Sequence, residues 1–172
     1  GIVWKNWAIT TNGGVIFYIG NAPGSTGTFG YPPQFEDRKA EINKLPEWER
    51  SKAWRTQLWK ELDAAPGHFR AMLALKTKLF FNAWDAPDNY NYHFLRRHIG
   101  ALQWTLGSMP LHVLGLVGIA LTASRWRALL PLYLLMVGIA ISLIVMFVIG
   151  RYKLPYLGLL CVFAGGGLAL LP

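Results

Sequence analysis

Residues 104–172 carry only four formally charged side chains, and this scarcity constrains the fold more than any other feature of the chain. The four are Arg125, Arg127, Arg151 and Lys153. They separate three apolar runs of about 19 to 21 residues, at 104–124, 129–149 and 154–172. At ~1.5 Å rise per residue, a helix of that length matches the ~30 Å hydrocarbon core of a bilayer. The pattern therefore predicts three transmembrane helices.

The alternative for these runs is a buried helix of a soluble protein. Such helices have an apolar stripe and a polar face, whereas 129–149 has no polar face. A backbone that crosses lipid must satisfy its hydrogen bonds internally, and a helix does so within one segment. Small residues, among them Gly118 and 165–167, occur where membrane helices approach one another closely. We therefore interpret 100–172 as three packed membrane helices.

The front of the chain has a different composition. All nine carboxylates and thirteen of the seventeen basic residues precede residue 99, which gives this part a net charge of +4 out of the total of +8. Its charges alternate in sign instead of forming a basic stripe, which argues against nucleic acid as a partner. We therefore divide the chain into a soluble module at 1–99 and a membrane part at 100–172.

Turn and helix signals organise this module. A β-prone run at 15–19 lies between the turn signal Asn12-Gly13 and a glycine-rich stretch, so 9–33 is predicted as a loop with a short β segment. Periodic stretches bounded by prolines predict helices over about 36–84. Lys76 and Lys78 are expected at a membrane surface, with their stems along apolar area. The predicted fold class is mainly α, with integral membrane helices and a small helical module.

The histidine, serine and cysteine residues do not occur in the sequence patterns that metal binding or nucleophilic catalysis requires. The four histidines have no partners at metal-ligand spacing. No serine has the surroundings of a nucleophile elbow, and Cys161 is a lone cysteine, which excludes an internal disulfide. We therefore predict no catalytic residue, no metal site and no cofactor within this chain.

Two segments have the composition of binding sites. The loop 84–94 mixes carboxylates, amides and aromatic rings, which favours carbohydrate contact by Asp85 and Asn89, although loops without ligands also have this composition. The triplet Arg151-Tyr152-Lys153 opens the third apolar run. Its two cations are suited to a lipid phosphate at headgroup depth. The same triplet would serve equally well as an interfacial anchor.

A series of short motifs in a fixed order resembles a known family. They are Thr11-Asn12-Gly13-Gly14, Phe17-Tyr18-Ile19-Gly20-Asn21, Pro23, Thr26-Gly27, a helical stretch ending at Pro66, the run 76–81 leading into Asn82, and Arg151-Tyr152-Lys153-Leu154-Pro155. The series resembles bacterial membrane glycosyltransferases of the GT-C superfamily, and among them the family related to dolichyl-phosphate-mannose protein mannosyltransferases. The likeness covers most of the chain. Family members carry glutamate where Asp85 stands, so the shorter acid departs from the pattern.

The resemblance implies sugar transfer from a polyprenyl-phosphate donor to a lipid, glycan or protein acceptor in the bacterial inner membrane. The implied partners are the lipid bilayer and this donor. The residues implied in donor-phosphate binding are Arg151, Tyr152 and Lys153, and those implied in the substrate loop are Asn12, Gly20, Asn21, Asp85 and Asn89. The acid that assists the attack lies in the family's first extracytoplasmic loop, so we expect it upstream of Gly1, in a longer protein.

The orientation in the membrane is predicted differently by two arguments. Positive charges are more numerous beside the module than in the loop with Arg125 and Arg127, which would place the module inside the cell. The resemblance places 1–99 on the extracytoplasmic side, and we follow it, because phosphate-binding cations distort such a count. The alternative functions are a non-catalytic membrane protein with a partner-binding module and a transporter fragment. No pattern specifies an oligomeric state.

Overall fold

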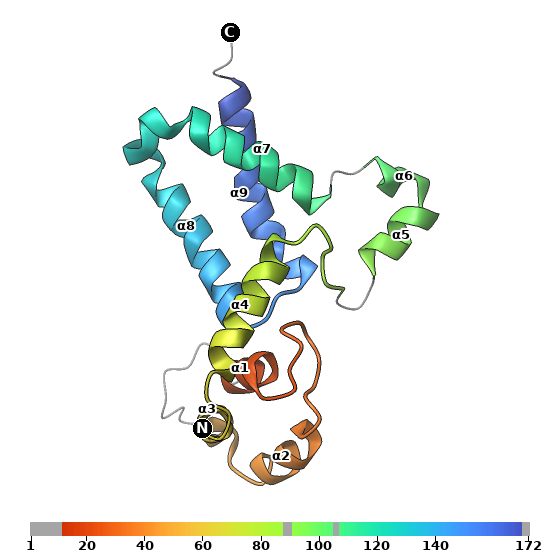
Figure 1. Ribbon diagram of the computed structural model, residues 1–172, viewed down its shortest axis with the longest axis vertical. Helices are drawn as coiled ribbons and strands as arrows, with labels where there is room; N and C mark the ends of the chain where they lie inside the picture. The colour runs from red at the N-terminus through yellow and green to blue at the C-terminus, as the bar shows by residue number, and fades with distance from the viewer. Residues whose placement is uncertain (1–11, 88–90, 105–106, 170–172) are drawn as a thin grey trace, which may run out of the picture. The chain divides into compact units, whose positions relative to one another are not determined.

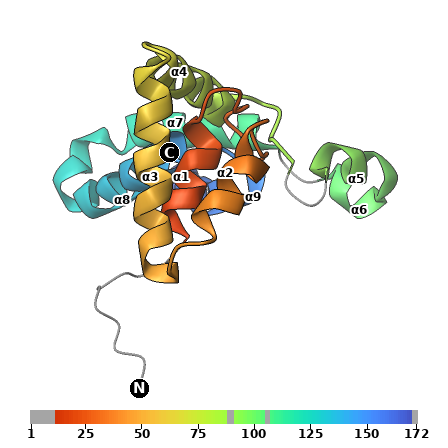
Figure 2. The same ribbon diagram turned by 90° about the horizontal axis from the view of Figure 1, so that it is seen from below.

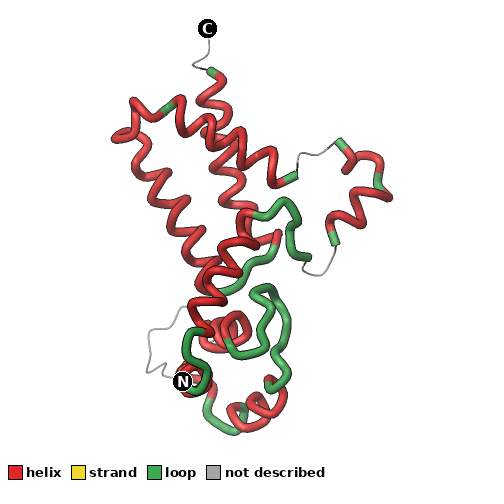
Figure 3. The backbone as a smooth tube through the Cα atoms, in the orientation of Figure 1, coloured by secondary structure: helices red, strands yellow, loops and turns green. Residues whose placement is uncertain are grey.

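The computed structural model describes residues 12–87, 91–104 and 107–169. Within these ranges the chain is mainly helical and contains no strand (Figure 3), which confirms the predicted mainly α fold. The chain divides into two compact units. The first unit comprises Gly1–Leu75 and Val145–Phe147, and the second comprises Lys76–Ile144 and Val148–Pro172. The predicted division into 1–99 and 100–172 concerns membrane position and stays a prediction.

In the first unit, two of the helices pack so closely that one contact position requires a glycine. The helices are α1 (Gly13–Asn21), α2 (Phe35–Ile42) and α3 (Glu47–Asp63), and α4 (His68–Phe81) runs from this unit into the second. Figure 2 shows α1 lying beside α3. The Gly14 N–H donates to the Ser51 hydroxyl at 3.0 Å. A Cβ at Gly14 would collide with the Ser51 backbone, so a glycine is required where α1 meets α3.

The short β segment predicted at 15–19 is helical in the structure, where it forms the middle of α1. The isolated propensity of these residues for strands is overridden by packing, because β-propensity depends strongly on context. Tyr18 and Ile19 are buried in a core with Trp54 and Leu58 of α3. The rings of Tyr18 and Trp54 lie 4.8 Å apart. A helix places both apolar side chains on the face that meets α3.

Four side chains of the first unit donate hydrogen bonds to one carboxylate, that of Glu61. The Tyr18 hydroxyl donates to both oxygens of Glu61, at 3.1 and 2.9 Å. Gln34, Arg38 and Gln57 donate to the same carboxylate at 3.1, 3.0 and 2.7 Å. Burial acts to raise the pKa of Glu61, but the four donors stabilise its charged form more strongly, so the pKa is lowered. Burial, followed by the bond to Glu61, raises the pKa of Tyr18.

Replacing Glu61 with glutamine should destabilise the first unit at neutral pH and reduce its acid sensitivity. A lowered carboxyl pKa contributes stability above the unfolded value of about 4.3, and this contribution is lost as the pH falls through the folded pKa. We expect a loss of about 1–3 kcal/mol at neutral pH, because an amide oxygen cannot accept from all four donors. Hydrogen exchange of the α3 amides, followed from neutral pH into the acid range in the intact chain, measures both effects.

Glu41→Gln is the matched control for this substitution. The Glu41 side chain is 68% exposed and lies 3.9 Å from Arg38, so its contribution is that of a surface pair. Exchange that responds equally to both substitutions, or to neither, would contradict the role assigned to Glu61.

The second unit contains a close crossing of two apolar helices. After α4 it comprises α5 (Tyr92–His98), α6 (Gly100–Gln103), α7 (Ser108–Leu121), the 3-10 turn η1 (Ala123–Arg125), α8 (Trp126–Val145, its last residue in the first unit) and α9 (Gly150–Leu168). Figure 1 shows α7 crossing α9. A Cβ at Gly118 would collide with the Phe163 carbonyl, and one at Gly167 would lie 2.7 Å from the Gly118 Cα. The small residues predicted to allow close packing therefore do so at Gly118 and Gly167.

Two helical ranges, Gly100–Leu121 and Ala123–Val145, are long and apolar enough to cross a membrane, judged by length and composition. The first range includes residues 105–106, which lie outside the described residues. The large apolar side chains that α7 and α8 expose include Val113, Leu116, Val117, Leu134, Leu135, Val137 and Ile141. Exposed apolar area of this extent indicates contact with lipid or protein. Helix α9 covers the third predicted span but does not pass the same test, so that span stays a prediction.

Lys76 is fully buried, so the prediction that its ammonium lies at a membrane surface is wrong. Its position on α4 is three residues from the apolar side chain of Leu79 and four from Phe80, which is also fully buried. Burial lowers the pKa of Lys76 to about 8. Lys78, on another face of the helix, is exposed.

Candidate functional site

The structure joins two segments that the sequence analysis treated separately. The Lys153 ammonium lies 2.5 Å from Oδ1 of Asp85, across 68 positions of sequence. The side chains are 1% and 15% exposed, respectively. The Gly150 N–H also donates to the carbonyl oxygen of Ala86 at 3.0 Å. The loop after α4 is therefore attached to the first turn of α9 by an ion pair and by a backbone hydrogen bond.

An aromatic ring lies near the buried ammonium. The Lys153 Nζ lies 5.8 Å from the ring centroid of Phe80, and this ring packs against Tyr156 at 4.7 Å. A buried ammonium is strongly destabilising without an opposite charge, and an aromatic face adds a smaller attraction. Asp85 supplies the opposite charge. Lys153 is therefore compensated within the protein, and its predicted contact with a lipid phosphate stays a prediction.

Arg151 and Tyr152 are the exposed members of the triplet. The Arg151 guanidinium lies 5.1 Å from the Tyr152 ring centroid and 3.4 Å from its hydroxyl. This arrangement leaves the guanidinium reachable from solvent beside an amphipathic ring, as a headgroup contact requires.

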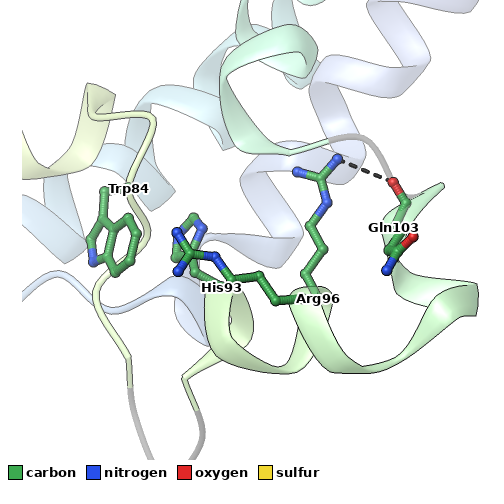
Figure 4. Close-up of a pocket in the computed structure, with 5 residues that line it drawn as sticks. Trp84, His93, Arg96 and Gln103 are labelled. Atoms are coloured by element: carbon green, nitrogen blue, oxygen red, sulfur yellow. Dashed lines mark hydrogen bonds between the residues drawn. The ribbon is translucent and has the colours of Figure 1, made fainter.

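An open pocket of about 410 Å³ lies next to the loop that carries Asp85. Its lining residues are Trp84, His93, Arg96, Arg97 and Gln103 (Figure 4). The rings of Trp84 and His93 are stacked, with centroids 3.8 Å apart and planes 10° apart. A guanidinium N–H of Arg96 donates to the Gln103 carbonyl at 3.3 Å, which ties α5 to α6 across the pocket.

Local hydrogen bonds set the orientation of His93. The Asn91 side chain accepts from the backbone N–H groups of His93 and Phe94, and so caps α5. The backbone N–H of Asp85 donates to Nε2 of His93 at 3.2 Å. Because that N–H can only donate, Nε2 accepts and the ring carries its proton on Nδ1. His93 thus retains one N–H donor besides this bond.

The pocket has the chemistry of an anion site. Among the residues that the structure describes, its charged lining side chains are two arginines, and none of the lining residues is a carboxylate. Guanidinium groups bind oxyanions through paired N–H donors in a fixed planar geometry. The stacked indole and imidazole provide an adjoining apolar wall. The arrangement is suited to an anion with an attached ring or chain.

Of the residues predicted for the substrate loop, Asn12 lies at one end of α1, and Gly20 and Asn21 lie at the other. Asn12 is exposed at the start of α1, where it lines a smaller open pocket of about 210 Å³. Gly20 and Asn21 are buried at the other end of this helix. The Asn21 amide donates to the carbonyls of Phe17 and Val145, both at 2.9 Å. Asp85 belongs to the second unit, and Asn89 lies outside the described residues.

Sequence reasoning named the aromatic loop but missed the pocket. The basic residues beside the module entered only the prediction of orientation, and His93 lies within the predicted loop 84–94. The available signal was helical spacing, because His93 precedes Arg96 by three residues and Arg97 by four, which places all three on one face of α5.

A buried polar pair lies on α7. The His112 Nδ1 lies 2.7 Å from the Ser108 carbonyl, so Nδ1 carries the proton. Ser108 Oγ and His112 Nε2 are buried and have no hydrogen-bond partner among the described residues. The imidazole instead packs against Phe80, Phe81 and Tyr156. Polar groups in an apolar helix are a feature of transport pathways, so this pair is the observation in favour of the transporter alternative.

Comparison with protein-family models, with curated proteins and with solved structures finds no match to this chain. Within the described ranges, no group of three or more histidine, cysteine, aspartate and glutamate side chains is placed to hold a metal ion. The motifs and the geometry of the second unit are therefore the observations that bear on function.

Proposed function

We propose that this chain is the C-terminal part of a bacterial membrane glycosyltransferase. It transfers a sugar from a polyprenyl-phosphate-linked donor to a lipid, glycan or protein acceptor. The observation that carries the proposal is the ion pair between Asp85 and Lys153. The GT-C resemblance assigns the loop of Asp85 to substrate and the triplet of Lys153 to donor phosphate, and a donor site requires these two segments to be neighbours.

The proposed reaction is a substitution at the anomeric carbon of the donor sugar. An acceptor hydroxyl oxygen forms a bond to this carbon while the bond from the carbon to the phosphate oxygen breaks. Polyprenyl phosphate leaves with the electron pair, and the hydroxyl proton passes to a carboxylate that we expect upstream of Gly1. Residues of this chain would stabilise the charge on the leaving phosphate, for which cations held in place by the fold are effective.

The proposal includes an arrangement in the membrane. Helix α9 would form a third span after the two ranges that pass the length and composition test. Residues 1–99 would lie on the extracytoplasmic side of the bacterial inner membrane, where lipid-linked donors are presented. Reporter fusions to the loop at Arg125 test this orientation, and a cytoplasmic signal is the expected result.

The enzymatic proposal is tested with the full-length protein in lipid nanodiscs and a radiolabelled polyprenyl-phosphate sugar. We expect protein-dependent release of polyprenyl phosphate, measured by mass spectrometry, and appearance of the label in an acceptor. Replacing Arg151 with alanine should weaken donor binding about tenfold or more, as expected for loss of a hydrogen bond to a charged group. A donor that stays intact and unbound would instead favour the non-catalytic or transporter alternatives.

A further inference from the structure

The pocket lined by Arg96 and Arg97 of α5 carries positive charge that takes no part in the ion pair of Asp85 and Lys153. Lys153 is already neutralised by a carboxylate, whereas none of the described residues that line the pocket of Arg96 and Arg97 is a carboxylate. Two guanidinium groups in one pocket, with no acid among its described lining residues, favour an anion of more than one negative charge. A phosphate monoester carries about −1.5 to −2 at neutral pH, which matches such a pair.

The pocket also has an ordered wall. The Trp84 and His93 rings are stacked, and the backbone N–H of Asp85 donates to Nε2 of His93. The same Asp85 is anchored by its side chain to Lys153 of α9. The Nδ1–H of His93 is thus held by the fold before any ligand binds, and so the loss of side-chain freedom on binding is reduced.

The position of the pocket along the chain points to a lipid phosphate. Arg96 and Arg97 lie shortly before Gly100, where the first range long enough to cross a membrane begins. Basic side chains at the end of a span lie at the depth of the headgroups. A phosphate ester with an apolar tail presents its charged group at this depth while its tail stays in the bilayer.

We propose that this pocket binds the phosphate group of a phosphate ester, with the guanidinium groups of Arg96 and Arg97 as charged donors and Nδ1–H of His93 as the neutral donor. Where this ester is polyprenyl phosphate, the leaving group of the proposed reaction, the inference rests on the proposed function and assigns the leaving phosphate to Arg96 and Arg97. A phosphate of a bilayer lipid and a free phosphate ion share this chemistry.

The test measures binding of geranyl phosphate, a short prenyl phosphate, to the detergent-solubilised full-length protein by isothermal titration calorimetry. Arg97→Gln should weaken binding about ten- to a hundredfold, the effect of one charge-assisted hydrogen-bonded contact. Arg96→Gln should have a similar effect, although it also removes the bond to the Gln103 carbonyl. An unchanged thermal midpoint of Arg97→Gln shows that the loss is not one of folding.

Two further variants locate the site. Arg127→Gln removes the same charge from an exposed position between α7 and α9 in sequence, and it should leave binding unchanged. Arg151→Gln should have a smaller effect than Arg97→Gln. Binding that is insensitive to Arg96 and Arg97, or that is weakened equally by Arg127→Gln, would overturn the inference.

Three probes identify the source of the phosphate. Geraniol, which lacks the phosphate, should not bind. Inorganic phosphate that binds as tightly as geranyl phosphate indicates a site for the free ion, and tighter binding of geranyl phosphate indicates a lipid ester. Nanodiscs of phosphatidylcholine with added phosphatidic acid should compete with geranyl phosphate if bilayer lipid is the ligand.

The inference and the proposed function fail separately. If Arg96→Gln and Arg97→Gln still bind geranyl phosphate and still transfer sugar, this site is disproved. The proposed enzymatic function would then still stand. Phosphate binding that depends on Arg97 in a protein that releases no polyprenyl phosphate would keep the site and reject the enzyme proposal.

Discussion

Replacing Lys153 with methionine should destabilise the second unit by about 3–5 kcal/mol, the loss expected when one partner of a buried ion pair is removed. The substitution keeps most of the apolar stem but leaves the Asp85 carboxylate, which is only 15% exposed, without its opposite charge. The hydrogen bond from the Gly150 N–H to the Ala86 carbonyl would remain, without the ion pair beside it. We expect the first turn of α9 to open more often.

Hydrogen exchange of the amides of the first turn of α9, measured in the full-length protein by mass spectrometry, reports this opening. A loss of about 3–5 kcal/mol corresponds to exchange faster by a factor of about one hundred to several thousand. Arg151→Met, a substitution of an exposed neighbour, is the matched control and should change exchange only slightly.

The double variant with Asp85→Asn and Lys153→Met separates the pair from its surroundings. Since no charge is left uncompensated, it should be more stable than the sum of the two single effects predicts, which a double-mutant cycle measures as a coupling energy. Additive effects would show that Asp85 and Lys153 do not act as a pair. They would contradict the attachment of the loop after α4 to α9 through this ion pair.

The sequence was sufficient to predict the apolar helices α7 and α8 of the second unit, but not α5, which begins within the predicted loop 84–94. The run predicted at 129–149 overlaps α8 (Trp126–Val145), and the one at 104–124 contains α7 (Ser108–Leu121). Local composition determines these elements, because an apolar run of this length has few alternatives to a helix. The ends differ by several residues because caps and turns at helix ends are local details that hydropathy does not encode.

The ion pair could not be predicted in the same way. Asp85 and Lys153 are separated by 68 positions, and nothing in the composition of either segment specifies the other as its partner. The prediction placed both in contact with substrate because a charge in a polar or interfacial setting suits a ligand. In the structure these two charges form an ion pair with each other, whereas Arg97 and Arg151 are exposed and Arg96 is half-buried.

The residues of α1 show why a loop was expected where a helix exists. Asn12-Gly13 and the later pair Gly20 and Asn21 are typical of turns. In the structure, position 20 requires a glycine because a Cβ there would collide with the Met146 backbone. The side-chain amide of Asn21 donates a hydrogen bond to the Val145 carbonyl. Both requirements come from the segment 145–147, which is distant in sequence and close in the fold.

Replacing Gly118 with valine should separate α7 from α9, at the upper end of the about 1–3 kcal/mol typical of overpacking, or beyond it. The reason is the atom that a side chain would meet. A Cβ at Gly118 would collide with the backbone carbonyl of Phe163, and a backbone cannot move aside as the end of a flexible side chain can. The helices must therefore shift apart along a crossing where Gly167 also approaches Gly118.

Gly138→Val isolates this packing effect from helix propensity. Gly138 lies within α8, and a Cβ there meets nothing within 4 Å, so both substitutions exchange the same residue types in a helix but only one lies at a crossing. The thermal midpoint of the detergent-solubilised protein and hydrogen exchange of the α9 amides should change for Gly118→Val and stay near wild type for Gly138→Val. Equal changes would mean that valine acts only by lowering helix propensity. They would contradict the close packing of α7 against α9 at Gly118.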